Sequence, residues 1–311
     1  MRLLELVDLT VSFPTVDGVV RAVDHVHLSI DDVERMGLIG ETGCGKTVLG
    51  MSIIRLLHPS ARVGGRILYR GRDLLEISAR DMRRLRGKEI ALIPQNPTTS
   101  LNPVLRVGDQ IAEVIQLHHG MSKPESWKLA VNMLREMRIP DPERRARQYP
   151  HELSGGMRER VLITMALACN PSFIIADEPT KGLDSKTKLQ ILGLMRTVTT
   201  GRSMLMITHD LGVARSICDR IAVMYAGELL EWGPSNEIMD DPLHPYTRGL
   251  INSLPSHGLR AIPGTSPSLI NLPSGCRFHP RCRLATKACK NVHPDMIDLG
   301  NGRAVRCILC T

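Results

Sequence analysis

Aromatic side chains are scarce in this chain, and long apolar runs are missing from it. The 311 residues include only three Phe, four Tyr and two Trp. Because modules for single-stranded nucleic acid stack bases on aromatic side chains, this scarcity argues against such a module. No apolar run approaches the roughly 18–20 residues that span a bilayer. The first residues, Met1–Asp8, carry acids where a secretory signal needs an apolar core. We therefore expect a soluble protein that is not exported.

The remaining composition is that of an ordinary globular protein. Hydrophobic residues make up 42% and charged residues 23%, which argues against a disordered or fibrous chain. The length suggests roughly two domains. The net charge of +8 suits nucleic acid, anionic lipid headgroups and nucleotide phosphates alike, so it does not choose among these partners.

The cysteines are unevenly distributed. Eight cysteines in a chain without an export signal point to metal or redox chemistry before disulfides. Three are scattered singly, whereas five crowd into residues 276–310. A stretch rich in Pro, Ser and Gly at 262–275 precedes them and is typical of a linker or an ordered irregular loop. We place a domain boundary near residue 235, where the last clear strand pair ends.

Before that boundary, short apolar runs alternate with helical patterns. Such runs, when bounded by polar residues, are typical of strands buried on both faces of a parallel sheet. We expect them at 33–39, 90–93, 173–176, 204–207 and 221–224. Helical patterns occupy 46–57, 186–197 and 211–216. The apolar spacing is helical across residues ~105–170. The sequence thus predicts an α/β domain with a mostly helical insertion.

The segment Gly40–Thr47 matches the phosphate-loop pattern G-x-x-x-x-G-K-[ST]. Its glycines permit a tight turn and leave backbone N–H groups to cradle phosphates at a helix N-terminus. Lys46 would reach the β- and γ-phosphates, and the Thr47 hydroxyl would ligate Mg²⁺. The alternative is a plain glycine-rich turn, which the preceding strand and following helix disfavour. The expected nucleotide contacts are Gly40, Glu41, Thr42, Gly43, Cys44, Gly45, Lys46 and Thr47.

A second acidic element supports this loop. The apolar run from Phe173 ends in Asp177 and Glu178. Asp177 can hold Mg²⁺ through water, as the acid of a Walker B strand does. Glu178 is expected on the other side of the strand, where it would polarise an attacking water as a general base. Alternatively, the two acids only end the strand or cap a helix. The presence of the phosphate loop in the same chain disfavours this alternative.

A second helix N-terminus suited to anions begins at Leu153–Arg160, which reads Leu-Ser-Gly-Gly-Met-Arg-Glu-Arg. Ser154 suits an N-cap, and Gly155 and Gly156 let backbone amides face an anion. One nucleotide cannot easily use both sites of one subunit. With these residues the chain resembles the ATP-binding cassette (ABC) ATPases. The resemblance implies that this signature closes over the γ-phosphate held by a second subunit.

The other elements of that family occur in order, and the resemblance covers about residues 1–235. It implies that Gln95 contacts Mg²⁺ and the lytic water, and that Asp184 of Gly182-Leu-Asp lies at a dimer interface. It also implies that His209 contacts the γ-phosphate and that Phe13 stacks on adenine. Departures from the family pattern are Cys44 in the phosphate loop, Lys181-Gly182 before Leu-Asp, and Glu159 in place of a frequent Gln. None removes a catalytic group, so we expect a competent ATPase.

Two segments narrow the branch of the family. Pro94–Pro103 and His244–Arg248 resemble the ATPases of di- and oligopeptide importers, as does the Gly-Cys-Arg-Phe-x-Pro-Arg-Cys pattern at Gly275–Cys282. Nickel importers share this architecture, so peptide and nickel both remain open as substrates. We expect an ABC-type ATPase domain at 1–235, with its helical subdomain at about 100–165, and a Cys-rich extension at 236–311.

Four cysteines of the extension have loose spacing, and we expect them to bind a metal centre: Cys276, Cys282, Cys289 and Cys307. Zinc knuckles favour two to four residues between ligands, whereas an all-cysteine ligand set suits a [4Fe–4S] cluster. Some family members with such a tail carry this cluster. Zn²⁺ and free thiols are the alternatives, and Cys310 is a spare ligand. Seven Lys and Arg residues between 277 and 306 would partly neutralise the cluster, and the phosphate loop is expected in another domain.

The resemblance implies a subunit that hydrolyses ATP to energise import of a peptide or a related small substrate. Its expected partners are a second ATPase subunit, either a copy or a paralogue, two integral-membrane permeases and an extracytoplasmic binding protein, with no nucleic acid. Its expected place is the cytoplasmic face of the membrane, as a peripheral subunit. The alternatives are a soluble ABC ATPase of DNA repair or translation, and an ATPase regulated by an iron–sulfur cluster.

Overall fold

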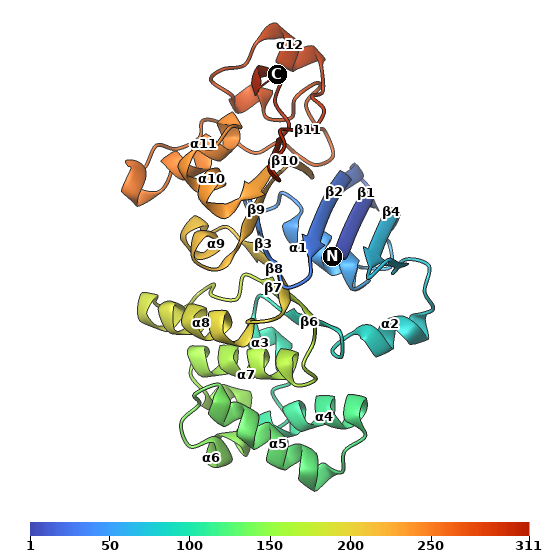
Figure 1. Ribbon diagram of the computed structural model, residues 1–311, viewed down its shortest axis with the longest axis vertical. Coiled ribbons are helices and arrows are strands. Elements are labelled where there is room, and N and C mark those ends of the chain that lie inside the picture. The colour runs from blue at the N-terminus through green and yellow to red at the C-terminus, as the bar shows by residue number, and fades with distance from the viewer. Residues whose placement is uncertain (311) are drawn as a thin grey trace. The chain divides into compact units, whose positions relative to one another are not determined.

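The computed structural model describes residues 1–310, and these divide into two compact units. Unit 1 comprises Met1–Glu76 together with the described residues from Met206 onward, and unit 2 comprises Ile77–Leu205. In Figure 1 the blue, orange and red parts of the chain belong to unit 1, and the green part belongs to unit 2. Strand β8 (Ser203–Thr208) carries the chain from unit 2 back into unit 1.

Unit 1 contains an antiparallel sheet that the sequence analysis did not predict. Its order is β2-β1-β4-β5, formed by β1 (Arg2–Thr15), β2 (Gly18–Asp31), β4 (Arg62–Tyr69) and β5 (Arg72–Asp73). Leu4, Leu6, Leu9 and Val11 of β1 are buried. The alternation of buried and exposed side chains along β1 is interrupted between Leu6 and Leu9, because the β1–β2 register shifts there.

The second group of strands in unit 1 holds the phosphate loop. The order β11-β12-β10-β9-β3 is formed by β3 (Arg35–Ile39), β9 (Arg220–Tyr225), β10 (Glu228–Pro234), β11 (Ile297–Asp298) and β12 (Ala304–Val305). Strands β3 and β9 are parallel and fully apolar at their centres, as predicted for strands buried on both faces. The predicted strand at 33–39 begins only at Arg35, because Val33 has a φ of 61° in a turn.

The helices of unit 1 are short: α1 (Lys46–Ile53), α9 (Leu211–Ile217), α10 (Ser235–Asp240), α11 (Pro245–Asn252) and α12 (Lys287–Asn291). The helix predicted at 46–57 stops four residues early. Arg55 adopts a left-handed φ of 52°, which ends a right-handed helix. Short 3₁₀ helices lie at Pro255–His257, His279–Arg281 and Ile308–Cys310.

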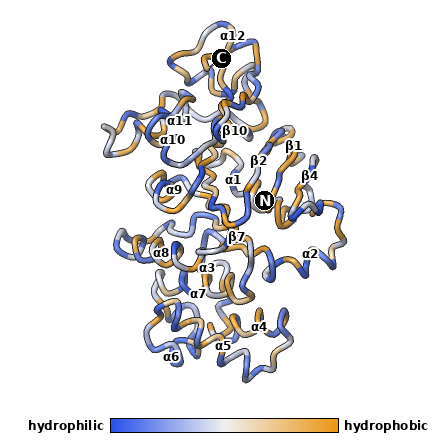
Figure 2. Tube along the Cα trace, viewed as in Figure 1, coloured by the Kyte–Doolittle hydropathy of each residue, from blue (hydrophilic) through white to orange (hydrophobic). Residues whose placement is uncertain are grey.

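Unit 2 pairs two parallel strands with a group of helices. The strands are β6 (Ile90–Ile93) and β7 (Phe173–Asp177). The helices are α2 (Ala79–Leu85), α3 (Pro97–Ser100), α4 (Val107–His119), α5 (Lys123–Glu136), α6 (Pro142–Ala146), a 3₁₀ turn at Pro150–Glu152, α7 (Gly155–Leu167) and α8 (Ser185–Val198). Along α4 and α5 the colour alternates between hydrophobic and hydrophilic (Figure 2), as expected for helices with one buried face. The buried face includes Val107, Ile111, Ile115, Ala130 and Leu134, so the predicted helical insertion is confirmed.

The C-terminal extension lies in the same unit as the phosphate loop. Strand β12 pairs with β10 through Glu231↔Val305 and Trp232↔Ala304. Tyr246 and Phe278 of the extension are buried against Tyr225 of β9, with ring centroids 4.6 and 5.4 Å from that ring. Residues of the extension thus pack into the core of the unit that holds the phosphate loop, whereas the sequence led us to expect two separate domains. None of the helices among residues 1–310 has both the length and the apolar character that crossing a bilayer requires.

Candidate active site

The phosphate loop connects β3 to α1, and two of its glycines are required by close backbone approach. A Cβ atom on Gly40 would lie 2.1 Å from the carbonyl oxygen of Met224. A Cβ atom on Gly45 would lie 2.0 Å from the carbonyl oxygen of Ala22. Both residues also have positive φ, at 153° and 110°, which favours glycine. The loop is thus held against the β9 and β2 strands.

Lys46 and Thr47 begin α1, as the loop pattern predicts. The Lys46 side chain is buried, and its Nζ donates to the carbonyl oxygens of Gly40 at 2.8 Å and Glu41 at 2.9 Å. Thr47, Thr42 and Gly43 are exposed. The loop therefore encloses a cationic amine, and it presents backbone and a hydroxyl at the start of a helix. That combination fits a polyphosphate and its metal.

Cys44 is a packing residue of this loop. It is buried, and burial raises the pKa of its thiol although Lys46 Nζ lies 3.7 Å from its Sγ. Because the thiolate is the reactive form, a protonated and buried thiol is chemically quiet. The geometry is that of an inert packing side chain.

Glu41 of the loop is clamped by residues that the sequence analysis did not assign. Arg281 of the extension contacts it through two hydrogen bonds, Nη1–Oε2 at 2.8 Å and Nη2–Oε1 at 2.9 Å. Ser266 also donates to its Oε2, and the Glu41 backbone N–H donates to the Tyr246 hydroxyl at 3.0 Å. Burial raises the pKa of Glu41, but the hydrogen bonds from Arg281 and Ser266 outweigh it and hold that pKa below its usual value.

Phe13 and His209 also belong to unit 1. Phe13 lies on β1 opposite Val20, near the turn to β2, and is only half-buried, so its ring has an accessible part. His209 follows β8 directly and is exposed. Both positions agree with side chains that meet a ligand rather than fill the core.

In unit 2, the predicted catalytic residues follow two neighbouring parallel strands. Ile93 of β6 pairs with Ala176 of β7, so Gln95 and the acids Asp177 and Glu178 follow the carboxyl ends of adjacent strands. Asp177 is buried at the end of β7. Glu178 has a left-handed φ of 49°, which means that the chain leaves the strand there. Side chains alternate between the two faces of a strand, and we expected this alternation to place Glu178 opposite Asp177. Because Glu178 lies outside the strand, the alternation does not apply to it.

The signature residues of unit 2 line a pocket of about 600 Å³ together with Asp184. Ser154 caps α7 by accepting from the Met157 N–H at 3.4 Å. Asp184 caps α8 by accepting from Lys186 and Thr187, which lowers its pKa. The lining of this pocket comprises Arg138, Pro140, Ser154, Gly155, Gly156, Met157, Arg160, Gly182, Leu183, Asp184, Thr187 and Gln190.

Two arginines of that pocket were missed by the sequence analysis. Arg160 donates to the Met137 carbonyl at 2.9 Å and to Gln190 at 3.2 Å. Arg138 lies close enough to add to the effect of burial in lowering the Arg160 pKa. Only the position of Arg160 in the signature segment could have suggested it, because nothing local marks Arg138. The pocket therefore combines helix-terminal amides with two cations, as an anion site requires.

The four predicted cysteine ligands line one small pocket with His244 and His279. Cys276, Cys289 and Cys307 are buried, and burial raises the pKa of Cys276 to about 11. Cys310 lies outside this lining and approaches the Leu243 carbonyl at 3.9 Å. Within residues 1–310, no group of three or more His, Cys, Asp or Glu side chains is arranged to hold a single metal ion.

Four arginines of the extension contact strands and loops of unit 1, and three of these form ion pairs there. Arg277 forms ion pairs with Asp24 and Glu228, and Arg281 forms one with Glu41. Arg303 pairs with Glu231 at 3.2 Å, and Arg306 donates to the Leu229 carbonyl at 3.1 Å. Of the seven basic residues expected to neutralise a cluster in part, Arg277, Arg281 and Arg303 are thus also balanced by acids of unit 1. The four arginines attach the extension to strands and loops of unit 1.

Comparisons with known proteins agree with this site. Residues 23–181 match the family model described as ABC transporter, and residues 230–289 match the C-terminal region of oligopeptide/dipeptide transporters. The oligopeptide transport ATP-binding protein OppD of Salmonella typhimurium is 44% identical, over 94% of this chain and 89% of that protein.

Solved ABC cassettes share the fold. A dimeric post-hydrolysis structure of the ATP-binding cassette MJ0796 with ADP and Pi has a TM-score of 0.67 at 28% identity, covering 75% of this chain and 98% of that one. CbiO1 from Clostridium perfringens, part of the transporter complex cbiONQ, has a TM-score of 0.65 at 26% identity over 77% of this chain and 91% of its own. With the phosphate loop, the acidic strand end and the signature helix in place, the chain belongs to the ABC transporter family as an ATP-hydrolysing subunit.

Proposed function

We propose that this chain energises the import of peptides through separate membrane subunits. The observation that carries the proposal is similarity to an oligopeptide transport ATP-binding protein over 94% of the chain, extension included. The extension match also favours an importer over a soluble ABC ATPase of DNA repair or translation. Nickel is the second candidate substrate, because the sequence resemblance covers nickel importers as well.

The hydrolytic roles are assigned residue by residue. Phe13 stacks on adenine, and Gly40–Thr47 cradle the phosphates, with Lys46 on the β- and γ-phosphates. Thr47 and Gln95 would hold Mg²⁺ with the support of Asp177, and the ion would neutralise phosphate charge when bound. Glu178 takes the proton from the attacking water. His209 contacts the γ-phosphate. The exposed Thr47 hydroxyl and the buried Lys46 amine at one helix start support this assignment.

Two ATPase subunits are proposed to act together, the partner being a copy or a paralogue. Ser154, Gly155 and Gly156 would meet the phosphate held by the partner, with Asp184 at the same interface. The pocket that these residues share with Arg138 and Arg160 supports this role, since it offers cations and helix-terminal amides to an anion. The dimeric state of the related cassette MJ0796 supports it as well.

The wider assembly follows from the same family. The chain would work with two integral-membrane permeases and an extracytoplasmic substrate-binding protein, as a peripheral subunit at the cytoplasmic face. The ATPase domain would occupy residues 1–235 and the extension 236–311. The two family matches, at 23–181 and 230–289, support that division.

The cysteine pocket is proposed to hold a [4Fe–4S] cluster, with Zn²⁺ as the alternative. Cys276, Cys282, Cys289 and Cys307 line one pocket, and four thiolates are the ligand set of such a cluster. The proposal rests on the four cysteines that share this pocket and on the sequence resemblance, because no such metal arrangement is found among residues 1–310. Burial raises the pKa of Cys276 to about 11, and a bound cation would favour its thiolate.

Uptake by cells tests the transport proposal. Cells that lack the endogenous gene are supplied with the wild-type chain or with Lys46→Ala, and uptake of a radiolabelled tripeptide and of radiolabelled nickel is measured. We expect tripeptide uptake with the wild type and its loss in Lys46→Ala. The matched control is Lys88→Ala, which removes an exposed lysine from unit 2 and should retain uptake. Wild-type uptake of nickel alone would replace the peptide assignment, and uptake of neither would refute import of both.

A further inference from the structure

A pocket of about 250 Å³ lies beside α11 in the extension, and it shares Pro245 and Phe278 with the cysteine pocket but none of its cysteines. Its apolar lining comes from Pro245, Ile262, Pro263, Phe278 and Leu284. Ile262 packs closely over Gly249 of α11, where an added Cβ would lie 2.8 Å from its Cγ1. The segment after α11 is therefore fitted onto the helix and forms one wall of the pocket.

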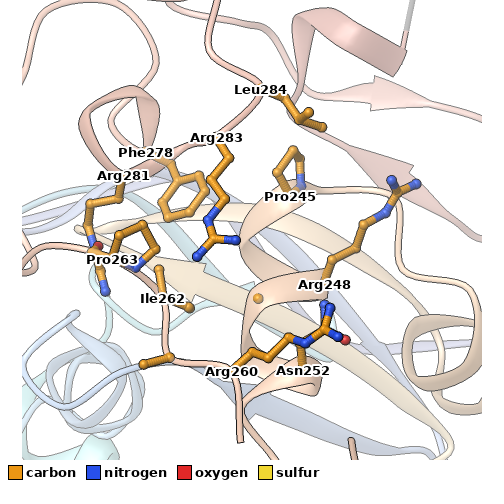
Figure 3. Close-up of a pocket in the computed structure, with 12 residues that line it drawn as sticks. Pro245, Arg248, Asn252, Arg260, Ile262, Pro263, Phe278, Arg281, Arg283 and Leu284 are labelled. Atoms are coloured by element: carbon orange, nitrogen blue, oxygen red, sulfur yellow. The ribbon is translucent and has the colours of Figure 1, made fainter. Parts of the chain in front are cut away.

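The polar lining of this pocket is strongly basic. Arg248, Arg260, Arg281 and Arg283 line it together with Asn252, and no Asp or Glu is among the lining residues. Figure 3 shows Arg283 projecting between Phe278 and Pro245. Arg260 and Arg283 form no ion pair within residues 1–310, and the Arg248 side chain donates only to the Pro242 carbonyl at 2.7 Å.

Charge, shape and size together define the ligand. Guanidinium groups bind carboxylates and phosphates through paired hydrogen bonds, and an apolar wall with few polar groups is typical of small-molecule sites. We propose that this pocket binds a small organic anion, in which a carboxylate or phosphate head group is attached to an apolar body. Arg260 and Arg283 take the head group, and Phe278, Pro245 and Ile262 take the body.

One lining residue connects this site to the phosphate loop. Arg281 faces the pocket and also holds both carboxylate oxygens of Glu41. A bound anion that also contacts Arg281 competes with Glu41 for that guanidinium, so the ligand and the nucleotide influence each other. Because such coupling is reciprocal, each ligand changes the dissociation constant of the other by the same factor. This pocket would bind its anion whether or not the transported substrate is a peptide.

Calorimetric titration of the purified full-length chain tests the site. The probes are hippurate, with a carboxylate head, and phenyl phosphate; inorganic phosphate lacks the apolar body, and benzyl alcohol lacks the charge. We expect hippurate or phenyl phosphate to bind more tightly than both controls, and the stronger of the two identifies the head group. The double variant Arg260→Gln/Arg283→Gln should weaken that binding at least tenfold. Arg66→Gln, at an exposed arginine of β4, should leave it unchanged.

Two further measurements separate this pocket from the phosphate loop. Lys46→Ala should abolish Mg-ATP binding and leave probe binding intact. The double variant Arg260→Gln/Arg283→Gln should weaken probe binding and leave Mg-ATP binding intact. Saturating probe should shift the dissociation constant for Mg-ATP about fivefold in the wild type. Absence of probe binding, or binding that survives in the double variant, overturns the site. An unchanged affinity for Mg-ATP overturns its coupling to the loop.

Discussion

Glu159 is a carboxyl group buried in the first half of α7. Its side chain is 2% exposed, its Oε1 has no hydrogen-bond partner within the described residues, and burial raises its pKa to about 8. The unfolded chain ionises this carboxyl near 4.5. The folded protein therefore holds a proton that the unfolded chain releases, so stability is fully present below pH 4.5 and falls as the pH rises toward 8.

Glu159→Gln should remove this pH dependence. The amide keeps the shape of the side chain and carries no charge, so we expect it to stabilise the protein by roughly 2–4 kcal/mol at pH 8. Below pH 4.5 the two proteins should be alike. Urea unfolding at several pH values between 4 and 9 measures the difference, with exposed Glu136→Gln of α5 as the matched control. An equal gain at pH 4 and pH 8 would contradict titration of Glu159 as the cause.

Glu178→Gln should separate ATP binding from hydrolysis. The substitution removes the proposed base and leaves Gly40–Thr47 intact, so Mg-ATP binding should persist while turnover falls by about 10²–10⁴-fold. An ATP-bound dimer should then accumulate, detectable by size-exclusion chromatography with multi-angle light scattering. Glu152→Gln, at an exposed acid, serves as the control. Hydrolysis at the wild-type rate would mean that another group is the base.

Local sequence patterns predicted some residues of the site and could not predict others. Lys46 and Thr47 were predicted because the pattern that defines them is contiguous. The contact between Glu41 and Arg281 was not, because a single sequence does not show which of its many arginines meets a given acid. For Glu178, period-two alternation failed since its left-handed φ of 49° takes it out of the strand.

At the scale of elements, substitution of Ser154, the N-cap of α7, should affect ATP hydrolysis by the dimer but not ATP binding by the isolated chain. Ser154→Arg places a large cation at the exposed start of this helix. Nucleotide affinity of the isolated chain should stay within about twofold, because its own phosphates lie on the phosphate loop. Hydrolysis by the assembled pair should be lost, since we propose that the partner's phosphate meets this helix start. A nucleotide-binding titration and a steady-state ATPase assay measure the two effects.

The control for that variant is Ser122→Arg, at the exposed N-cap of α5 in the same unit. It should lower helix stability by about 1 kcal/mol and leave hydrolysis unaffected. Loss of ATP binding by the isolated Ser154→Arg chain would contradict a role in trans.

The sequence predicted the strands that are buried on both faces. It did not predict the strands that are buried on only one face. The observed β6 has the predicted bounds, 90–93, because all four residues are apolar and Glu89 and Pro94 bound them. Strands β1 and β2 were missed although each has 14 residues. Their register shifts interrupt the alternation that marks a half-exposed strand, and Asp8 and His25 adopt positive φ within them.

At the scale of the whole molecule, the cysteine pocket should determine whether the extension stays attached. Anaerobically purified protein should be brown and contain about four irons and four sulfides per chain. Cys282→Ser should lose both and loosen the extension. Arg281, the neighbour of Cys282, holds Glu41 of the phosphate loop. The Cys282→Ser variant should therefore also bind nucleotide several-fold more weakly.

Iron, sulfide and zinc analyses, with limited proteolysis of the extension, measure these effects. Cys169→Ser, at a buried cysteine of unit 2, is the control and should retain iron and sulfide. One zinc per chain without sulfide would establish a structural zinc site in place of the cluster.

The clamp on Glu41 also sets an order of events during synthesis. Glu41 and Arg281 are 240 positions apart, so 240 further residues must be translated before the carboxylate can meet its guanidinium. The loop that cradles phosphates is made long before the residues that fix it. A nascent chain that has not yet reached Arg281 therefore carries an unfinished phosphate loop. Full nucleotide affinity should begin only after the extension has been made, so translation products that stop before Arg281 should compete weakly for ATP.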